Sequence, residues 1–342
     1  MKLRDYIIRR LLLLIPVLIG VSVIIFIITR LGGQNPATLY ITDRMTDRQI
    51  AAIYAKYGFD QPLYTQYWNW LVGVFQGDLG YSRSARMPVL QAIIEKFPAT
   101  FELTTVSIII AVLIGVPLGI LSAKNRNKPV DHASRIFSLA GVSIPIFWLA
   151  VMLQFIFYLQ LHWFPMGLRF DDKMASVWYN AVPQITHFYT IDSLLAGNWG
   201  AFGDALYHLC LPSLALSYAS MAVIARLMRS SMLEVFGMEY IKTARAKGLS
   251  EKVVVRKHAV RNALIPTTTI IGLSYGGLLS GAVLTETIFS WPGLGRWSTD
   301  AVTGADRAAI LGFTMLAAIV YVIVNLIVDI AYAYLDPRIR LE

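Results

Sequence analysis

The sequence predicts an all-α polytopic membrane protein with six transmembrane helices. Of its 342 residues 56% are hydrophobic and only 15% are charged, whereas soluble domains carry about 25% charged residues. The apolar residues lie in long charge-free blocks without the alternation of β-barrel strands. Six such blocks approach or exceed the roughly 18–20 residues that a helix needs to cross a bilayer. They are 11–29, 103–123, 136–161, 209–225, 263–285 and 308–328.

The first block is expected to stay in the protein as a span, because it is longer than a signal peptide and no small-residue cleavage site follows it. The fourth block is short, and we expect its helix to start near Ala205. The sixth continues past Asp329 to Leu335. The single cysteine, Cys210, lies in the fourth block, so the chain does not depend on an internal disulfide.

The distribution of basic residues predicts the orientation. With the N-terminus in the cytoplasm, the cytoplasmic segments contain 19 of the 30 Lys and Arg residues, although they are much shorter than the outer segments. This asymmetry follows the positive-inside rule. We therefore expect both termini in the cytoplasm. The net charge of +9 reflects this topology, and no nucleic-acid partner is expected because the basic residues flank spans.

The blocks divide the chain into three parts. Residues 1–30 form the cytoplasmic N-terminus and first span, and residues 31–98 form an outer, extracytoplasmic segment. Residues 99–342 form the core membrane domain, with an outer loop at 162–206 and a cytoplasmic loop at 229–262.

The outer segment contains an aromatic stretch at 62–75, with Tyr64, Tyr67, Trp68 and Trp70. Such side chains favour the headgroup level of a bilayer. The stretch therefore predicts a helix that lies on the outer leaflet, and contact with substrate is the alternative.

Several catalytic motifs are missing. The chain has no G-x-x-x-x-G-K-[ST] phosphate loop, no H-E-x-x-H and no C-x-x-C, and its five histidines are scattered. We therefore expect no cofactor or metal in this chain and no ATP bound through a phosphate loop.

The cytoplasmic stretch 239–266 is basic and lies between two apolar blocks. Its pattern predicts a short helix from Met238 to Lys247, which Gly248 ends because glycine accepts a left-handed backbone. A second helical run at 251–262 leads to the fifth span. The first helix could enter a groove on a partner protein, or the stretch could lie on anionic lipid. The residues alone leave both alternatives open.

The motifs of this stretch resemble the cytoplasmic loop of ABC-importer permease subunits. The broad family has E-A-A, three residues and then G, whereas this chain has Lys242-Thr243-Ala244 before Gly248. The departure resembles the peptide-permease subgroup, which has TARAKGL, then H-x-x-R-N-A, then Pro. Here TARAKGL occupies 243–249, and His258 and Pro266 occupy the later positions.

The resemblance extends over nearly the whole chain. Matching stretches, in order, are RRLLLLIPVLIGVSVIIF, GDLGYS, FPATFELT, SIPIFW, RSSMLEV, ETIFSWPGLGRW and DPRIR. Together they are very specific, and the chain resembles the first permease subunit of the dipeptide/oligopeptide/nickel ABC importers. The resemblance implies a type I importer permease fold with an elaborated outer region, in the plasma (inner) membrane.

The resemblance also implies partners and roles. The expected partners are a second homologous permease subunit, two ATPase subunits that bind ATP and Mg, an extracytoplasmic binding protein and the lipid bilayer. The chain itself would be a transport subunit and not an enzyme. The implied ATPase-coupling residues are Glu239, Tyr240, Thr243, Ala244, Ala246, Lys247, Gly248 and Leu249.

Candidates for the pathway or gate lie in and after the fifth span. Small residues at four-residue spacing let helices approach closely. The candidates are Gly272, Tyr275, Gly276, Ser280 and Glu286. Packing is the alternative for the small residues, and a solvated helix end is the alternative for Glu286. Gln154 and Tyr158 are weaker pathway candidates. Asp329 is expected to pair with Arg226 or Arg229, or to act in gating.

Other functions remain open at this point. The same machine could import oligosaccharides or nickel in place of peptides. An intramembrane serine protease would need residues such as Ser143 and His258, which the topology places apart. A free-standing channel would conduct ions without an ATPase, and the cytoplasmic helix argues against it.

Overall fold

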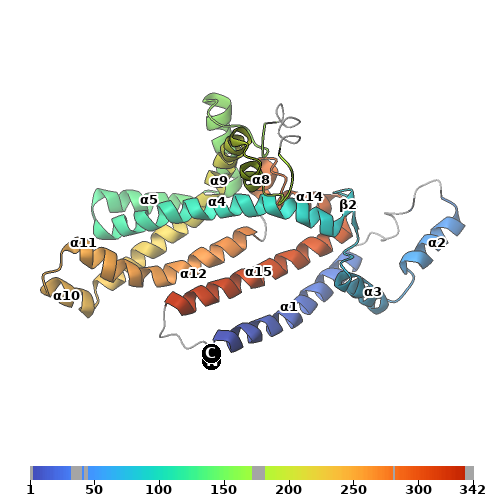
Figure 1. Cartoon of the computed structure of the whole chain (residues 1–342), viewed down its shortest axis with the longest axis horizontal. Helices are drawn as coiled ribbons and strands as arrows, with labels where there is room; N and C mark the ends of the chain where they lie inside the picture. Colours follow the sequence, from blue (N-terminus) through green and yellow to red (C-terminus); the bar gives the residue numbers. More distant parts are fainter. Residues whose placement is uncertain (1–2, 32–40, 42–44, 172–181, 280–281, 336–342) are drawn as a thin grey trace.

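The computed structural model describes residues 3–31, 41, 45–171, 182–279 and 282–335. Its long helices run side by side in an elongated layer, with α5 and α1 at opposite edges (Figure 1). One end of the layer carries α10 and is called the α10 end; the other carries β1 and β2 and is called the hairpin end. The long helices are α1 (Leu3–Leu31), α4 (Val89–Lys124), α5 (Pro129–Ser143), α9 (Trp199–Phe236), α12 (Val260–Leu279) and α15 (Arg307–Leu335).

The all-α membrane fold is confirmed, but the described residues do not reach six spans. Four helices, α1, α4, α9 and α15, are long and apolar enough to cross a membrane. The block at 136–161 is broken: α5 and the run Ile146–Gln160, made of α6 (Ile146–Leu153) and the π-helical η2 (Gln154–Gln160), meet at 105° and count as a fifth span only together. The break has a local cause, because Ile144 precedes a proline and takes an extended conformation with ψ 124°.

The fifth apolar block contributes α12, which does not qualify as a span by length and composition. Its 20 residues include three threonines and three glycines as well as Pro266, and these residues lower its hydropathy. Two neighbouring helices are longer than their apolar blocks. Helix α4 begins at Val89, inside the segment 31–98, and α9 begins at Trp199 rather than near Ala205.

The hairpin end carries the short elements. Strands β1 (Tyr81–Ser82) and β2 (Met87–Pro88) pair antiparallel and lead directly into α4. The remaining short elements are α2 (Asp47–Tyr57), α3 (Leu63–Phe75), α8 (Tyr189–Leu195), α13 (Val283–Ile288) and α14 (Leu294–Thr303). At the opposite end α9 continues into α10 (Glu239–Ala246), α11 (Glu251–Val253) and η3 (Val254–Ala259).

Glycines bring α4 and α9 into close contact. A Cβ atom on Gly119 would lie 2.6 Å from the carbonyl oxygen of Ala225, and one on Gly115 would lie 2.9 Å from that of Met221. Both distances are too short for any side chain, so these two positions require glycine. The packing follows the small-residue rule for membrane helices, and α4 and α9 form the most extensive helix pair of the described structure.

Helix α3 has two different sides. Tyr67 packs edge-on against Phe26 of α1 with ring centroids 5.4 Å apart, and its hydroxyl lies 2.8 Å from that of Ser22. Tyr64 and Trp68 on the other side are 75% and 63% exposed. The helix therefore offers an uncovered aromatic face next to the first span.

Candidate functional site

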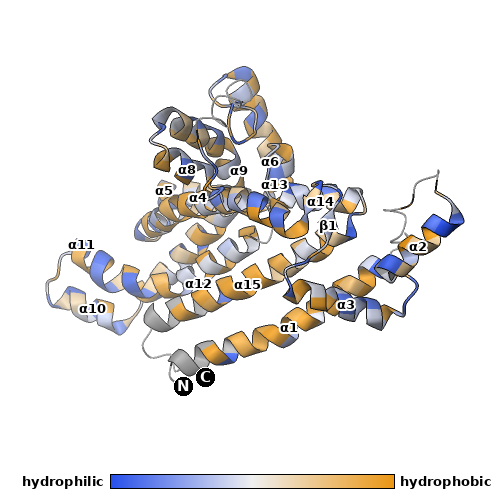
Figure 2. Ribbon diagram, turned by 45° about the vertical axis from the view of Figure 1, so that its right-hand side comes forward, coloured by the Kyte–Doolittle hydropathy of each residue, from blue (hydrophilic) through white to orange (hydrophobic). Residues whose placement is uncertain are grey.

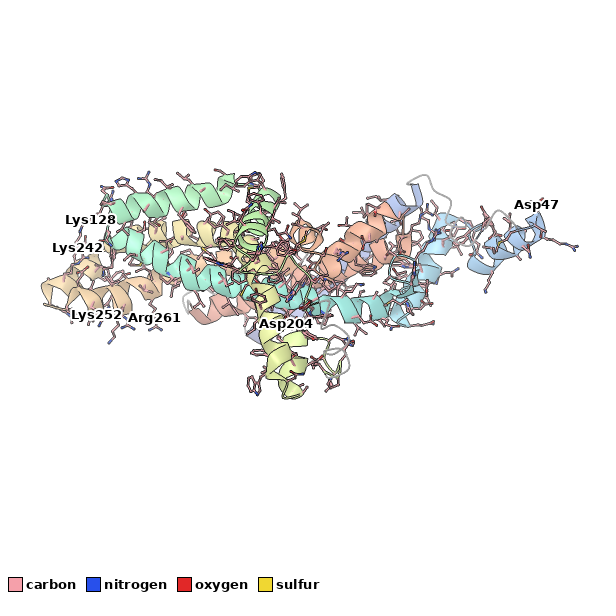
Figure 3. All side chains as sticks on the ribbon, turned by 90° about the horizontal axis from the view of Figure 1, so that it is seen from above. Asp47, Lys128, Asp204, Lys242, Lys252 and Arg261 are labelled. Carbon is pink, nitrogen blue, oxygen red and sulfur yellow. The ribbon has the colours of Figure 1, made fainter. Side chains whose placement is uncertain are left out.

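Helix α10 projects from one end of the layer, and hydrophilic residues concentrate there on α10 and α11 (Figure 2). Basic side chains gather at this end: Lys128, Lys242, Lys252 and Arg261 lie together, whereas Asp47 lies at the far end (Figure 3). The helix runs from Glu239 to Ala246, with Met238 in an extended conformation before it. The predicted helix is thus present, shorter by one residue at each terminus.

Gly248 makes the turn that ends α10. Its φ is +75°, a left-handed conformation that glycine adopts without steric cost. Its N–H donates to the carbonyl oxygen of Arg245 at 2.9 Å. A Cβ atom at this position would have open space within 4 Å. The requirement for glycine is therefore conformational and does not come from crowding.

The inner face of α10 anchors it to the bundle. Ile241 is fully buried and Ala244 is 6% exposed. Both pack in one apolar cluster with residues of α9 and η3, namely Met228, Met232, Val235, Val254, Val255 and Ala259. Because η3 continues without a break into α12, a displacement of α10 would press on two long helices.

The face of α10 that points away from the bundle is exposed to solvent. Of the eight residues that the resemblance assigns to ATPase coupling, all except Ala244 are exposed. These are Glu239, Tyr240, Thr243, Ala246, Lys247, Gly248 and Leu249. Ala244 is turned toward the bundle and belongs to the anchor. A partner that grips α10 would therefore contact the seven exposed positions.

An ion pair spans the Gly248 turn. The guanidinium of Arg245 donates to both carboxylate oxygens of Glu251, at 2.7 and 3.1 Å. This contact with Arg245 lowers the pKa of Glu251. Both side chains are substantially exposed, so the pair orients α10 against α11 more than it stabilises the fold.

A buried ion pair lies at the base of the same end. Asp131, at the start of α5, is fully buried. It accepts from Arg229 of α9 at 2.6 and 2.8 Å, from the Ser122 hydroxyl at 2.6 Å and from the Asn127 N–H at 3.0 Å. Arg229 therefore pairs with Asp131, a partner that the sequence did not indicate. The side chain of Asp329 lies outside the described residues.

A second buried carboxylate lies at the hairpin end. Glu286 of α13 is fully buried, so its expected alternative as a solvated helix end is wrong. It accepts from the Thr100 hydroxyl of α4 at 2.7 Å and from the Arg296 N–H of α14 at 3.0 Å. No cation pairs with it in the described part of the chain. Burial raises the pKa of Glu286 to about 7, against the opposing effect of these hydrogen bonds.

Glycines and a tryptophan complete this cluster. A Cβ atom on Gly293 would lie 2.5 Å from both the Glu286 carboxylate and the Thr100 hydroxyl. Thr100 also accepts from the Leu294 N–H at 2.8 Å, and the Trp291 indole donates to the Ala99 carbonyl at 2.8 Å. The stretches FPATFELT and ETIFSWPGLGRW thus form one unit that fixes α13 and α14 to α4.

A third buried carboxylate ties the hairpin to α15. Asp306 accepts from the hydroxyl of Ser82 at 2.8 Å, and from the N–H and hydroxyl of Ser84 at 2.8 and 2.9 Å. The indole of Trp297 donates to the Ser84 hydroxyl at 3.1 Å. Sequence reasoning did not single out Asp306 or its serine partners.

The loop between η2 and α9 carries an ion pair that sequence reasoning also missed. Arg169 donates to Glu102 of α4, and Thr190 of α8 donates to the same carboxylate through its N–H at 2.9 Å and its hydroxyl at 2.6 Å. Arg169 borders a cavity of about 250 Å³, together with residues of both charges such as Glu95 and Lys96.

The other pathway candidates differ in what they contact. Gly276 is buried against Val324 of α15, where a Cβ atom would lie 3.1 Å away. The Tyr275 hydroxyl lies 2.7 Å from that of Thr105. Gly272 lies on the same helix, one turn before Gly276. Ser280 lies outside the described residues.

Gln154 and Tyr158 differ in their contacts. The Gln154 amide donates to the carbonyl oxygens of Met166 and Ile288, at 2.7 and 3.2 Å. It is therefore a satisfied polar group. Tyr158 is 40% exposed and lines a separate open pocket with His162.

The residues do not assemble into a serine-protease site. Ser143 ends α5 and His258 lies in η3, and no hydrogen bond joins them in the described part of the chain. The chain contains G-L-S-Y-G at 272–276, the spacing of a nucleophile elbow. This stretch lies inside α12 and not on a strand-to-helix turn, so it lacks the geometry that exposes the serine.

Comparison with known proteins identifies the family. Residues 115–341 match the family described as binding-protein-dependent transport system inner membrane component, and residues 3–104 match the N-terminal family of the same transport systems. The chain is 44% identical over 326 residues to the probable D,D-dipeptide transport system permease protein DdpB of Escherichia coli, covering 95% of this chain and 94% of the relative.

Further relatives are similar over almost their full length. The dipeptide transport system permease protein DppB of Alkalihalophilus pseudofirmus is 42% identical, over 98% of this chain and 99% of the relative. The glutathione transport system permease protein GsiC of Salmonella choleraesuis is 37% identical, with the same coverage. The resemblance identified from the sequence motifs is confirmed: this chain belongs to the permease components of binding-protein-dependent ABC transport systems.

Proposed function

We propose that this chain is one permease subunit of an ATP-driven importer for dipeptides or oligopeptides. The peptide assignment is supported by the names of its relatives, which include dipeptide, D,D-dipeptide and oligopeptide permeases. The chain would form half of the pathway beside a second, homologous permease. Two ATPase subunits would supply the hydrolysis of Mg-bound ATP, and a binding protein would deliver the substrate from outside.

The observation that carries this proposal is the two-faced structure of α10. Its apolar inner face is packed against α9 and η3, while seven positions with the expected coupling sequence are exposed. An exposed short helix with an anchored back suits capture in a groove of a partner protein. In the proposed mechanism each ATPase grips one such helix, and closure of the ATPase dimer moves α9 and α12.

The orientation belongs to the same proposal. The α10 end faces the cytoplasm of the cell, both termini lie on that side, and the chain resides in the inner membrane. The concentration of Lys and Arg in the short segments at this end supports the assignment. The hairpin end then faces outward, where Glu286 braces α13 and α14 against α4 as part of the outer gate. Gly272, Tyr275, Gly276 and Ser280 would belong to a gate surface where helices of the two permease subunits slide past each other.

Co-purification tests the assembly. The chain is expressed with its neighbouring genes, a tag at Glu342 is used for capture, and the associated polypeptides are identified. A second permease and ATPases are expected. A chain that is stable alone would contradict the proposal and favour the lipid-bound interpretation of α10. Thermal-shift screening of the accompanying binding protein against peptides, oligosaccharides and nickel would then distinguish the three substrate classes.

Gly248→Pro tests the coupling role. Proline fixes φ near −65°, whereas Gly248 has φ +75°, so the turn that aims α10 cannot form. We expect loss of substrate-stimulated ATP hydrolysis and uptake while the chain remains in the membrane. Wild-type coupling in this variant would contradict the proposed role of α10.

A further inference from the structure

A pocket opens between α5 and α9 near the α10 end. Its volume is about 180 Å³, several times the ~30 Å³ that one water molecule occupies in the liquid. It is thus large enough for a phosphate group. The lining residues are Ser134, Arg135, Ser138, Leu139, Ala225, Arg226 and Arg229.

The pocket has an excess of positive charge. Three arginines line it and no acidic residue does. Asp131 does not line the pocket and pairs with Arg229 alone among the three arginines. Arg135 and Arg226 are exposed and have no acidic partner in the described part of the chain. Two guanidinium groups, one on α5 and one on α9, therefore line the pocket with no acidic partner among the described residues and can bind an anion there.

Two hydroxyl groups add neutral donors. Ser134 and Ser138 are 4% and 5% exposed, and neither has a hydrogen-bond partner among the described residues. Neither hydroxyl oxygen is among the fully buried atoms that lack a partner, so both hydroxyls are accessible from the pocket. Both serines line the pocket beside the arginines, so a bound oxyanion would satisfy their hydroxyls as well as the guanidinium groups.

The surroundings of the pocket are those of a lipid-facing surface. Helix α5 is an edge helix of the layer (Figure 1). Its outward side carries Ile136, Leu139 and Val142, which are 68%, 58% and 52% exposed. Arg226 lies ten residues before the end of α9, or about 15 Å along the helix axis. The arginines thus lie where a span meets its polar end, with apolar side chains extending from them toward the membrane centre.

We propose that this pocket binds the phosphate headgroup of an anionic phospholipid, with Arg135 and Arg226 as its principal ligands and Ser134 and Ser138 as additional donors. Basic pockets between membrane helices are suited to such headgroups, and arginine binds phosphate with several parallel hydrogen bonds. The acyl chains would lie along Ile136, Leu139 and Val142. With the proposed orientation, this lipid belongs to the cytoplasmic leaflet.

Lipid retention tests the site. The chain is purified with its partner subunits in mild detergent, and phosphatidylglycerol and phosphatidylcholine are titrated in while bound lipid is measured by native mass spectrometry. The test variant is the double substitution R135Q/R226Q. The control is R126Q/K128Q, which removes the same charge from two exposed residues of the α4–α5 turn outside the pocket. A parallel titration uses glycerophosphate, which has the headgroup chemistry without acyl chains.

The expected result is saturable binding of phosphatidylglycerol, weakened about tenfold or more in R135Q/R226Q and unchanged within about twofold in the control. An equal loss in both variants would mean attraction to surface charge and would overturn the site. Equally tight glycerophosphate binding without retained lipid would make the ligand a soluble phosphate and overturn the lipid assignment. Crosslinks from Leu139 to the second permease, with no lipid bound, would show that a protein covers the pocket and would also overturn it.

Discussion

Asp131 near the α10 end and Glu286 near the hairpin end are both fully buried carboxylates, yet only Asp131 has a cation beside it. Asp131 is held by the guanidinium of Arg229. Glu286 is held by a hydroxyl and backbone N–H groups. The stability of the two ends should therefore depend on different properties of their buried groups. The α10 end depends on an intact charge pair, whereas the hairpin end depends on the protonation state of one group.

Breaking the charge pair should give the largest effect. Arg229→Met leaves Asp131 buried with only Ser122 and Asn127 as donors, and we expect a loss of about 3–5 kcal/mol in unfolding free energy. Asp131→Asn should cost less, about 2 kcal/mol, because the Arg229 side chain is 22% exposed and can reach water. The measurement is unfolding of the purified protein in mixed micelles.

The double variant D131N/R229M is the control for this asymmetry. Since it removes both charges, it should recover much of the loss caused by R229M alone. If the two single variants lose equal unfolding free energy and the losses add in the double variant, the pair contributes no coupling energy. The α10 end would then not depend on an intact charge pair.

The pH dependence of the hairpin end should be the next largest effect. Burial raises the pKa of Glu286 to about 7 from an ordinary 4.5. Between these values the folded state binds more protons than the unfolded state, so stability falls as pH rises through this window. The total fall attributable to Glu286 is about 3 kcal/mol.

Glu286→Gln should flatten this pH profile, because the amide keeps acceptor capacity for Thr100 and cannot ionise. Glu234→Gln, on an exposed site of α9, serves as the matched control and should leave the profile as in wild type. Melting temperatures at pH 5 and pH 8 give the comparison. If the wild type and E286Q lose stability in parallel over this range, the carboxylate is not the responsible group.

The sequence predicted the helical blocks and α10 well because both depend on local information. A long run without charged residues is stable only inside a membrane or buried in protein, so it can be recognised from the sequence. Gly248 ends α10 because glycine adopts the left-handed conformation by itself. The bend at Ile144 also has a local signal, since SIPIFW contains a proline inside the apolar block 136–161, which the prediction of six spans treats as one helix. In the same way, glycines at 115 and 119 specify the contact of α4 with α9.

The buried polar pairs could not be predicted in this way. Asp131 and Arg229 are separated by 98 positions in the sequence, and Thr100 and Glu286 by 186. Each is an unremarkable polar residue until the fold brings its partner beside it. Arg226 and Arg229 were both expected as partners of Asp329, because charge and depth along the helices are all that a sequence offers. Asp131 lies beside Arg229 only because the turn between α4 and α5 brings the start of α5 next to α9, and the sequence alone does not show this.

A smaller effect is expected at the turn that aims α10. Gly248→Ala keeps the N–H that proline would remove but penalises the left-handed conformation by about 1–2 kcal/mol. We expect faster amide hydrogen exchange in α10 and little change elsewhere. Gly203→Ala is the matched control: this glycine lies exposed in α9, and a Cβ atom there would meet nothing within 4 Å. It should be neutral or stabilising by up to about 1 kcal/mol. Slow exchange in α10 of G248A would mean that the helix is held independently of its turn.

The exposed pair of Arg245 and Glu251 should give the smallest effect, although its hydrogen bonds are about as short as those between Asp131 and Arg229. These side chains are 43% and 54% exposed, so solvent screens the charges and the coupling in a double-mutant cycle should be at most about 1 kcal/mol. The contribution is present at neutral pH and is lost as pH falls through the lowered pKa of Glu251. It should also shrink in 1 M salt, where the screening length is about 3 Å, whereas the coupling of the buried pair should persist. A coupling of several kcal/mol that resists salt would mean that the α10 end is as rigid as the bundle beneath it. A weak, salt-sensitive coupling is what a helix needs if a partner is to move it.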